Sequence, residues 1–382
     1  MKEEIVLPNY NHCILNTINS ILKHYQVKTK YKGLPELDEI LKKGYQNIIL
    51  IVLDGMGESL IRSVSPNGFF MKHHATTLTT VCPSTTTAGM NTYYSGKPPI
   101  ETGWIAMSQY FKEYGRAIEM MRQIDTYTGE QYTNIEKDIF ELVKYEPVYE
   151  QIERASQNVK AYEISPNFCQ RRGKRKIDAD NLNLMADAIE TLCKNPEKKF
   201  IFAYQENPDS ILHKYGCQSE EAKQFIKQAE EILDTMCEKI KETNSLVIIS
   251  ADHGHKDIET IYDVMNLKEI QDCLIMPPSL ESRAVTFWVK EEKKQKFEEL
   301  FKKQFEQKFI LYKKEELLEQ NLLGYGKQHP KVDDFIGDYI AISISDSIIK
   351  LGTNLSKQRK DKLSTHCGFS KEEMEVPLII IK

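Results

Sequence analysis

Six consecutive apolar residues at 48–53, within the stretch NIILIVLDGMG, predict a β-strand that is buried on both faces. The strand delivers Asp54 to its carboxyl end, and Gly55 and Gly57 follow. Open α/β sheets bind their ligands at this edge. A carboxylate placed there needs a helix terminus, a basic side chain or a metal ion to compensate its charge.

Most of the remaining pattern alternates between short apolar runs and helical spacing. The clearest helix is predicted at 222–240, where apolar residues recur every three or four positions. Residues 83–96, PSTTTAGMNTYYSG, predict a turn and then a helix that ends at Gly96. Further strands are expected at 76–82, 159–164, 200–204 and 246–250, and further helices at 14–25, 34–43, 147–155 and 179–193. This alternation predicts a mostly parallel, doubly wound α/β sheet.

Two parts of the chain do not follow that alternation. Residues 97–145 are polar and tyrosine-rich, and we expect them to form a loop. From residue 282 a strand, a helix with a phenylalanine stripe, another strand and a short helix predict a small inserted α+β cap at 282–335. The flanking residues, 1–281 and 336–382, then form the core, and strands at 338–345 and 376–381 are expected to return to the main sheet.

Composition narrows the class of protein. A chain of 382 residues with a formal net charge of −5 does not suggest stable nucleic-acid binding, which usually needs a basic balance. The eight cysteines are scattered without a CxxC pair, so neither a disulfide framework nor a thiolate zinc cluster is indicated. No apolar run approaches the roughly 20 residues of a membrane span, and the start lacks a signal core. We therefore expect a cytoplasmic protein without a membrane partner; the oligomeric state is not indicated.

Histidines beside carboxylates carry the candidate chemistry. In NPDSILHKYG, Asp209 and His213 are four residues apart, so on one helical turn they can share a cation. In SADHGH a predicted strand ends directly in Asp252 and His253. With His366 of STHCGF and with Asp54, these residues supply three carboxylates and three imidazoles, which suits two zinc-like ions acting on a phosphoryl group.

The turn at PSTTTAG offers a nucleophile for such a site. A threonine hydroxyl is a weak nucleophile at neutral pH, but metal coordination activates it, and a helix N-terminus adds N–H donors for an anion. Thr86 is our candidate, although a single threonine at this place is more often a helix cap.

Together LDGMG, PSTTTAG, NPDSILHKYG, SADHGH and STHCGF resemble the alkaline phosphatase superfamily, specifically its nucleotide pyrophosphatase/phosphodiesterase-like branch, in an order and spacing that cover most of the chain. The resemblance implies a three-layer α/β/α sandwich. It implies one metal ion on Asp209, His213 and His366, and a second on Asp54, Asp252, His253 and the oxygen of Thr86. The implied reaction hydrolyses a phosphodiester or pyrophosphate in a small phosphorylated substrate through a phosphothreonine, with zinc as the expected metal and manganese or iron as alternatives.

The substrate-binding residues depart from that branch. Thr87 stands where an aromatic residue often follows the nucleophile, and Met107 and Ser108 stand where an asparagine binds a phosphate oxygen. Thr87 and Ser108 are therefore only candidates for substrate contact. A phosphomonoesterase remains an alternative, as does a non-catalytic phospholigand-binding protein.

Two further features have open roles. His255 follows the ligand pair directly, and we expect it to support a ligand or to lie on the surface rather than to bind metal. A basic run is expected to be a solvated loop, with steering of an anionic substrate as the alternative; it comprises Arg171, Arg172, Lys174, Arg175 and Lys176.

Overall fold

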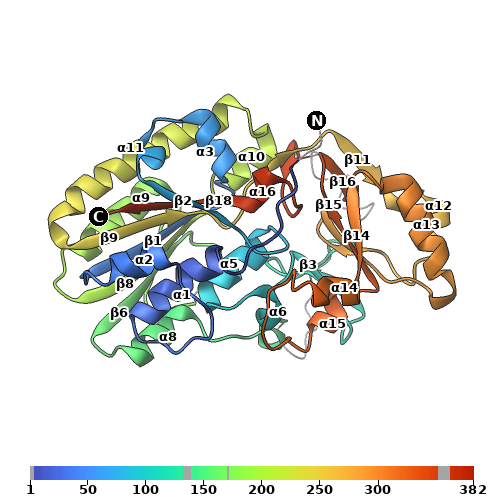
Figure 1. The fold of residues 1–382 in the computed structure, drawn as a ribbon, viewed down its shortest axis with the longest axis horizontal. Helices are drawn as coiled ribbons and strands as arrows, with labels where there is room; N and C mark the ends of the chain where they lie inside the picture. Colours follow the sequence, from blue (N-terminus) through green and yellow to red (C-terminus); the bar gives the residue numbers. More distant parts are fainter. Residues whose placement is uncertain (1–3, 132–138, 170–171, 352–361) are drawn as a thin grey trace.

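The computed structural model describes residues 4–131, 139–169, 172–351 and 362–382. Its larger part is a seven-stranded sheet at the left of Figure 1. In spatial order the strands are β2 (His74–Thr79), β18 (Glu375–Ile381), β9 (Ser245–Ser250), β1 (Asn47–Leu53), β8 (Lys198–Gln205), β6 (Val159–Ser165) and β7 (Lys176–Asp178). Strands β9, β1, β8, β6 and β7 run parallel, and β18 is antiparallel to both of its neighbours. The predicted mostly parallel sheet is confirmed.

Helices cover both faces of this sheet (Figure 1). One face carries α1 (Ile14–His24), α2 (Pro35–Leu41), α5 (Thr86–Ser95) and α8 (Val148–Ala155). The other carries α3 (Glu58–Val64), α4 (Phe69–Lys72), α9 (Leu182–Cys193), α10 (Asp209–Tyr215) and α11 (Glu220–Ile240). Every residue of the central strand β1 is buried, because strands flank both edges and helices cover both faces. This layering explains why the sequence of β1 is uniformly apolar.

A second seven-stranded sheet lies to the right in Figure 1. Its order is β14 (Phe309–Lys313), β15 (Tyr339–Ser343), β13 (Ala284–Phe287), β12 (Ser279–Leu280), β3 (Ser108–Phe111), β4 (Arg116–Glu119) and β5 (Ile124–Asp125), with antiparallel neighbours throughout. Helix α13 (Lys294–Phe305) packs on it through the predicted stripe, since Phe297, Phe301 and Phe305 are buried. The shorter helices are α6 (Pro99–Thr102), α7 (Ile139–Leu142), α12 (Lys268–Gln271), α14 (Lys314–Glu319), α15 (Val332–Phe335) and α16 (Lys371–Met374), with one-turn 3-10 segments at Lys241–Thr243, Val264–Asn266 and Glu291–Lys293.

The second sheet corrects two of our expectations. Residues 339–343 do not return to the main sheet, because β15 pairs with β13 and β14. Residues 97–145 are not simply a loop, because they contribute β3, β4 and β5. The apolar pattern of β15 identified a buried strand correctly, but pairing between distant segments is not encoded in the local pattern. The return of β18 to the main sheet is confirmed.

Two short strand pairs lie outside the two large sheets. Strand β10 (Lys256–Asp257) pairs antiparallel with β17 (Ser364–Thr365), and β11 (Thr260–Asp263) pairs in parallel with β16 (Ser347–Lys350). The first pairing places the end of the SADHGH motif beside the start of STHCGF.

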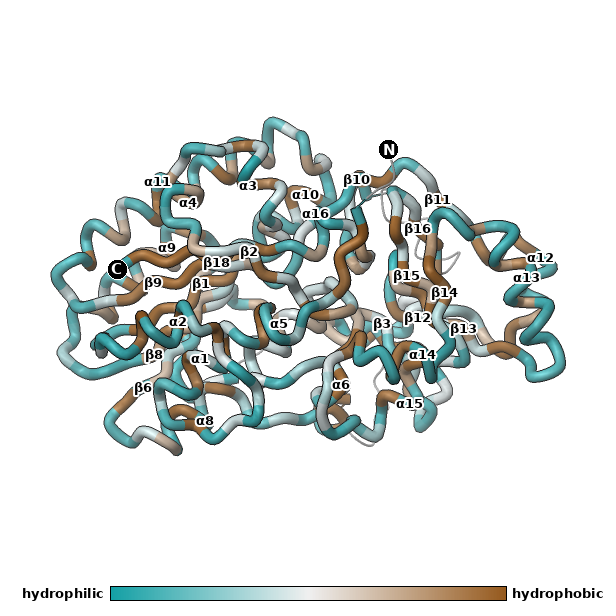
Figure 2. Tube along the Cα trace, viewed as in Figure 1, coloured by the Kyte–Doolittle hydropathy of each residue, from teal (hydrophilic) through white to brown (hydrophobic). Residues whose placement is uncertain are grey.

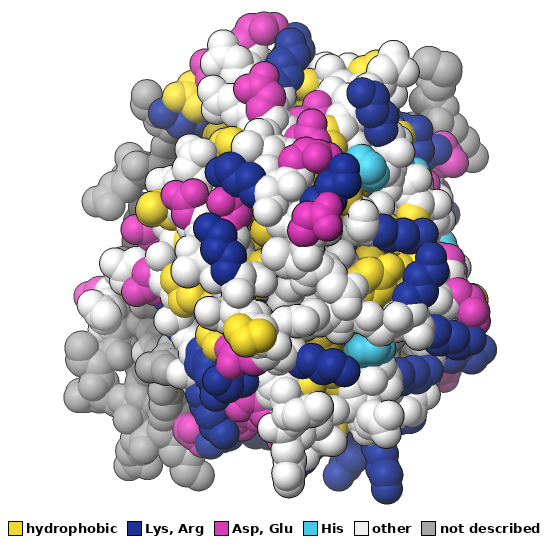
Figure 3. Space-filling view, turned by 90° about the vertical axis from the view of Figure 1, so that its left-hand side faces the viewer, with side chains coloured by type: hydrophobic (Ala, Val, Ile, Leu, Met, Phe, Trp, Pro, Cys, Tyr) yellow, Lys and Arg dark blue, Asp and Glu magenta, His cyan; other side chains and the backbone are white. Residues whose placement is uncertain are grey.

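Hydropathy along the chain follows this architecture. Apolar segments concentrate in the strands of both sheets, and polar segments lie on the outer faces of the helices (Figure 2). On the end of the molecule away from the second sheet, basic and acidic side chains are interspersed (Figure 3). Among the described residues, no helix combines the length and the apolar character that a membrane crossing requires.

A buried ion pair joins the second sheet to the C-terminal part of the core. The side chains of Arg283 and Glu373 are both fully buried, and two guanidinium nitrogens of Arg283 donate to the two carboxylate oxygens of Glu373 at 2.7 Å each. Arg283 also donates to the carbonyls of Ser345 and Ser347. Glu373 accepts the backbone N–H of Gly368 at 2.7 Å. The pair therefore fixes the loop that carries His366.

Replacement of Arg283 by methionine should destabilise the protein strongly. It leaves the Glu373 carboxylate buried without its partner, which typically costs about 3–5 kcal/mol in the free energy of unfolding. Urea denaturation followed by circular dichroism would measure this loss. The matched control is Lys42→Met, which removes an exposed pair with Glu39 and should change stability by less than about 1 kcal/mol. Equal effects of the two substitutions would contradict the role of the buried pair.

Candidate metal centre

The predicted motifs converge where the strands of the main sheet end. Strand β1 lies between β8 and β9, with Leu53 opposite Gln205 and Val52 opposite Ser250. Parallel register therefore brings the residues that follow these strands to one edge of the sheet. They are Asp54 after β1, Asp209 at the start of α10 after β8, and Asp252 and His253 after β9. His366 joins them because β17 pairs with β10.

A first group consists of Asp54, Asp252 and His253, whose ligand atoms lie within 4.8 Å of one another. The Nε2 atom of His253 is 3.3 Å from Oδ1 of Asp54 and 3.5 Å from Oδ2 of Asp252. Tyr204 donates its hydroxyl to Asp54. The Oδ2 atom of Asp252 is buried without a hydrogen-bond partner among the described residues. A buried, unsatisfied carboxylate oxygen is costly, so it marks a place for a cation.

A second group consists of Asp209, His253, His255 and His366. The Oδ1 atom of Asp209 lies 2.7 Å from Nε2 of His255 and 3.6 Å from Nε2 of His366. The Nε2 atom of His213 is 3.4 Å from the same oxygen, although His213 falls outside the tightest cluster. Lys362 donates to that nitrogen of His213 at 2.8 Å.

The orientation of the imidazoles suits metal binding. The Nδ1 atom of His253 lies 3.0 Å from the carbonyl of Gly254, and that of His213 lies 2.7 Å from the carbonyl of Ser364. Because a carbonyl only accepts, each Nδ1 must donate, so Nε2 is the nitrogen of each ring that can bind a metal ion once it is deprotonated. Carboxylate oxygens and imidazole nitrogens are the ligands that zinc and similar ions prefer. The donor set therefore fits two divalent ions.

Burial and the close approach of carboxylates shift the pKa values of the first group. Burial, together with the nearby Asp252 and Asp209, raises the pKa of Asp54 well above its ordinary value. Burial also raises the pKa of Asp252. Burial would lower the pKa of His253, but Asp252 and Asp54 outweigh it and raise that pKa to about 10. A cation between these groups would offset the repulsion between the carboxylates, which adds to the effect of burial on the pKa of Asp54.

The groups around Asp209 shift in the opposite sense. Burial would raise the pKa of Asp209, but His213, His255 and His366 hold it well below its ordinary value. Burial lowers the pKa of His213 to about 3 and that of His366 well below its usual range. Low imidazole pKa values keep these rings neutral, the form that binds metal.

Thr86 is the first residue of helix α5 and faces the first group. Its Oγ1 atom lies 3.2 and 3.3 Å from the two oxygens of Asp54 and 3.1 Å from Nε2 of His253. Gly89, one turn later, permits this close approach, because a Cβ atom there would lie 2.8 Å from the carbonyl of Asp252. The small residues of PSTTTAG thus let the helix N-terminus reach the carboxylates.

His255 is buried and contacts Asp209, so it does not lie on the surface. Its Nδ1 atom is 3.0 Å from the hydroxyl of Ser364. In the sequence DHGH, one glycine separates His253 from His255. This spacing indicates that both rings can reach the same site.

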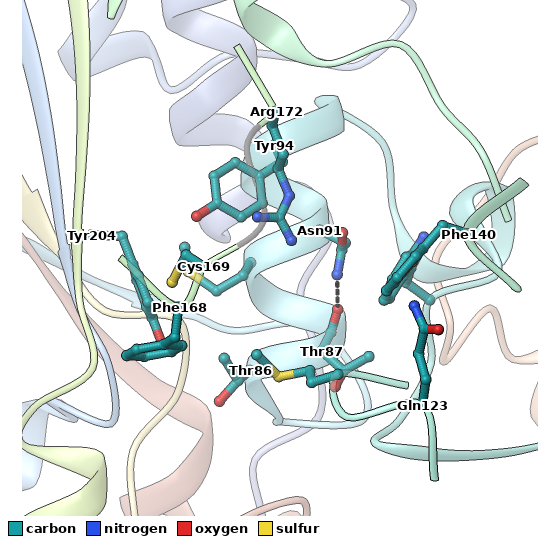
Figure 4. A pocket seen from close by; sticks show the side chains of 13 residues that line it. Thr86, Thr87, Asn91, Tyr94, Gln123, Phe140, Phe168, Cys169, Arg172 and Tyr204 are labelled. Carbon is teal, nitrogen blue, oxygen red and sulfur yellow. Dashed lines mark hydrogen bonds between the residues drawn. The ribbon is translucent and has the colours of Figure 1, made fainter. Parts of the chain in front are cut away.

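A cavity of about 300 Å³ opens beside Thr86 (Figure 4). Thr87 lines it, as do Asn91 and Tyr204, whereas Ser108 is not among its lining residues. Instead, the hydroxyl of Ser108 is hydrogen-bonded to that of Thr126 at 2.5 Å. The remaining lining residues are Met90, Tyr94, Trp104, Met121, Gln123, Phe140, Phe168, Cys169 and Arg172. These come from separate segments, and apart from Arg172 of the basic run they gave no local signal in the sequence.

The basic run is divided by the fold. Arg172 lines the cavity. Arg175 pairs with Glu153, and Lys176 donates to the carbonyls of Pro166 and Cys169. Lys174 lies 3.9 Å from Glu153, and Arg171 lies outside the described residues.

Comparisons with solved structures support the fold. Murine ectonucleotide pyrophosphatase/phosphodiesterase 5, as an inactive threonine-to-alanine variant in complex with AMP, matches with a TM-score of 0.63 and 16% identity over 87% of each chain. The human enzyme of the same name gives a TM-score of 0.62, 15% identity and the same coverage. Phosphonoacetate hydrolase from Sinorhizobium meliloti 1021, in complex with phosphonoformate, matches with a TM-score of 0.63 and 15% identity over 87% of this chain and 89% of that one.

Comparison of the sequence with models of protein families identifies its family. A search of curated protein sequences gave no match. The family model described as type I phosphodiesterase/nucleotide pyrophosphatase matches residues 48–360, which include the segments that carry Asp54, Thr86, Asp209 and Asp252. The chain belongs to the type I phosphodiesterase/nucleotide pyrophosphatase family, a family of phosphoric ester hydrolases in the alkaline phosphatase superfamily.

Proposed function

We propose that this protein hydrolyses phosphodiester or pyrophosphate bonds, with Thr86 as the nucleophile and two divalent metal ions as cofactors. The observation that carries the proposal is the position of the Thr86 hydroxyl, within 3.3 Å of both Asp54 and His253 at the N-terminus of helix α5. Zinc is the metal we favour, because the donors are imidazoles and carboxylates. Manganese or iron is the alternative.

Each side chain has a definite task in this proposal. Asp209, His213 and His366 would hold one ion, and Asp54, Asp252 and His253 the other. When bound, the two ions would offset negative charge on the phosphoryl group and on the attacking and leaving oxygens. Asp54 accepts the hydroxyl of Thr86 and so orients its oxygen toward the substrate. The N–H groups at the start of α5 add donors for the phosphoryl oxygens.

The reaction then has two displacements at phosphorus. In the first, the oxygen of Thr86 bonds to phosphorus, the bond to the leaving group breaks, and the hydroxyl proton ends on the leaving oxygen. In the second, water attacks the phosphothreonine, phosphorus leaves Thr86, and a proton from the water restores the hydroxyl. Asp54 and His253, which lie within hydrogen-bonding distance of the Thr86 hydroxyl, would hold the ion that favours loss of its proton.

The cavity beside Thr86 favours a diester or pyrophosphate over a monoester. Its 300 Å³ can hold a second substituent on phosphorus, which a monoester lacks. Similar folds bind AMP in the murine protein and phosphonoformate in the bacterial hydrolase, which supports a small phosphorylated substrate here.

All eight cysteines are unpaired, which supports our expectation of a reducing cytoplasm.

Replacement of Thr86 by alanine should reduce turnover at least roughly a thousand-fold, because the nucleophile is lost. Release of 4-nitrophenol from bis(4-nitrophenyl) phosphate, with zinc or manganese present, would measure turnover. Thr86→Ser is the matched control, since it keeps a hydroxyl and should retain part of the activity. Equal turnover by wild type and Thr86→Ala would remove Thr86 from the mechanism. A clear wild-type preference for 4-nitrophenyl phosphate would instead identify a monoesterase.

The number of bound metal ions per chain should distinguish the site around Asp54 from the site around Asp209. After reconstitution and dialysis, we expect about two zinc ions per chain, as two-metal sites require. Asp54→Asn and Asp209→Asn should each lose about one ion, because a neutral amide is a weaker ligand than a carboxylate. Elemental analysis measures this, with His12→Gln as a control at a half-exposed histidine paired with Glu36. Wild-type protein that retains no zinc, manganese or iron would disprove the two-metal site.

A further inference from the structure

We propose that the cavity beside Thr86 recognises a second oxyanion, a carboxylate or a phosphoryl group, on the organic substituent of the substrate, and that Arg172 binds it. This inference rests on the proposed function and adds the class of substrate. It makes Arg172 a specificity residue at the end of the cavity away from Thr86 (Figure 4).

Charge is the first argument. Among the described residues that line the cavity, Arg172 carries the only charged side chain, and the others are aromatic, apolar or neutral polar. Water screens a guanidinium less when aromatic side chains surround it. Such a guanidinium attracts an anion more strongly than an exposed arginine would. The cavity therefore has a positive end that faces an otherwise neutral interior.

The second argument is the fixed position of that guanidinium. It lies over the ring of Tyr94, with 4.1 Å between the guanidinium carbon and the ring centroid. In Figure 4 it extends toward the space between Tyr94 and Asn91. The backbone N–H of Arg172 donates to Glu163 at 2.8 Å, which anchors the residue. A planar guanidinium held in this way matches a planar carboxylate or a phosphoryl group.

The rim of the cavity indicates what separates the two anionic groups. Phe168 and Met121 line the cavity, yet 61% of Phe168 and 47% of Met121 are exposed. Trp104 and Phe140, which also line it, stack with centroids 5.5 Å apart. Large apolar side chains left open at a cavity suit an apolar or flat ligand body that covers them. We therefore infer a substituent with an apolar body and a terminal oxyanion.

A purely structural role is the competing explanation for Arg172. Buried Glu163 accepts the backbone N–H groups of Arg172 and Gly173, so the arginine charge could serve only to balance that carboxylate. The two explanations differ in one measurable respect. A structural arginine affects all substrates alike, whereas a specificity residue discriminates between anionic and neutral substituents.

The test uses matched diesters with zinc-loaded protein. The substrates are 4-nitrophenyl phenyl phosphate and four analogues, which carry a carboxylate or a phosphonate in the 3- or the 4-position of the phenyl ring. We expect kcat/KM to be roughly ten-fold or more higher for an oxyanion-bearing diester, as for a charge-assisted hydrogen bond. Comparison of the carboxylate and phosphonate arms identifies which oxyanion is preferred. Arg172→Gln should abolish the preference, and the loss should appear in KM for the oxyanion-bearing diesters.

Arg175→Gln is the matched control, because it lies in the same basic run but pairs with Glu153 outside the cavity. It should keep the wild-type preference. Absence of a preference in wild type, or an equal loss for all diesters in Arg172→Gln, would overturn the inference.

Binding separates this inference from the proposed reaction. If no diester is hydrolysed, the proposed function fails, but calorimetry with the Thr86→Ala variant and the same diesters still measures recognition. Arg172→Gln would then be introduced into the Thr86→Ala variant. If the oxyanion-bearing diesters bind more tightly to Thr86→Ala, and this advantage is lost in the double variant, the result would support Arg172 as the oxyanion-binding residue. Equal affinity for all the diesters would overturn it.

Discussion

The convergence of three acidic side chains at one edge of the main sheet is the constraint on which the rest of the site depends. Asp54 and Asp252 are buried, and the ion pairs found for them among the described residues are with His253 rather than with a lysine or arginine. Repulsion between such carboxylates opposes folding unless positive charge is supplied. The imidazoles, the N-terminus of α5 and the bound ions we propose all supply it. In the reaction that we propose, the same arrangement acts on a phosphoryl group.

The second sheet is part of this arrangement although none of its strands carries a candidate metal ligand. Arg283 joins it to Glu373, and Glu373 holds the backbone of Gly368 two residues after His366. Cys367, between them, has a φ of 98°, which side-chain-bearing residues adopt only when the surroundings enforce it. The buried pair is well placed to enforce it. The geometry of His366 thus depends on contacts with a sheet other than the one that carries the aspartates.

The sequence predicted correctly those elements that leave a pattern within their own segment of the chain. The strands that deliver Asp54 and Asp252 are buried on both faces, and that burial leaves an uninterrupted apolar run in the sequence. Pairing between distant strands leaves no such trace. Residues 339–343 look the same whether they join the main sheet or the second one, and 97–145 contribute strands of only four and two residues. The expected ligand residues were therefore brought together, while the second sheet was underestimated.

The cavity shows why substrate recognition was harder to predict than chemistry. Asp54, Asp252 and His253 follow strands of the main sheet, where register fixes their positions. The cavity walls instead combine residues from α5, α7 and β8 with residues from the segments after α6 and β4 and from the loop before β7. Thr87 lacks the aromatic ring that the family resemblance led us to look for. Tyr94, seven residues or about two turns later on the same helix, and Phe140 supply rings to the same space. Recognition can thus change through these peripheral segments while the buried carboxylates keep the phosphoryl chemistry in place.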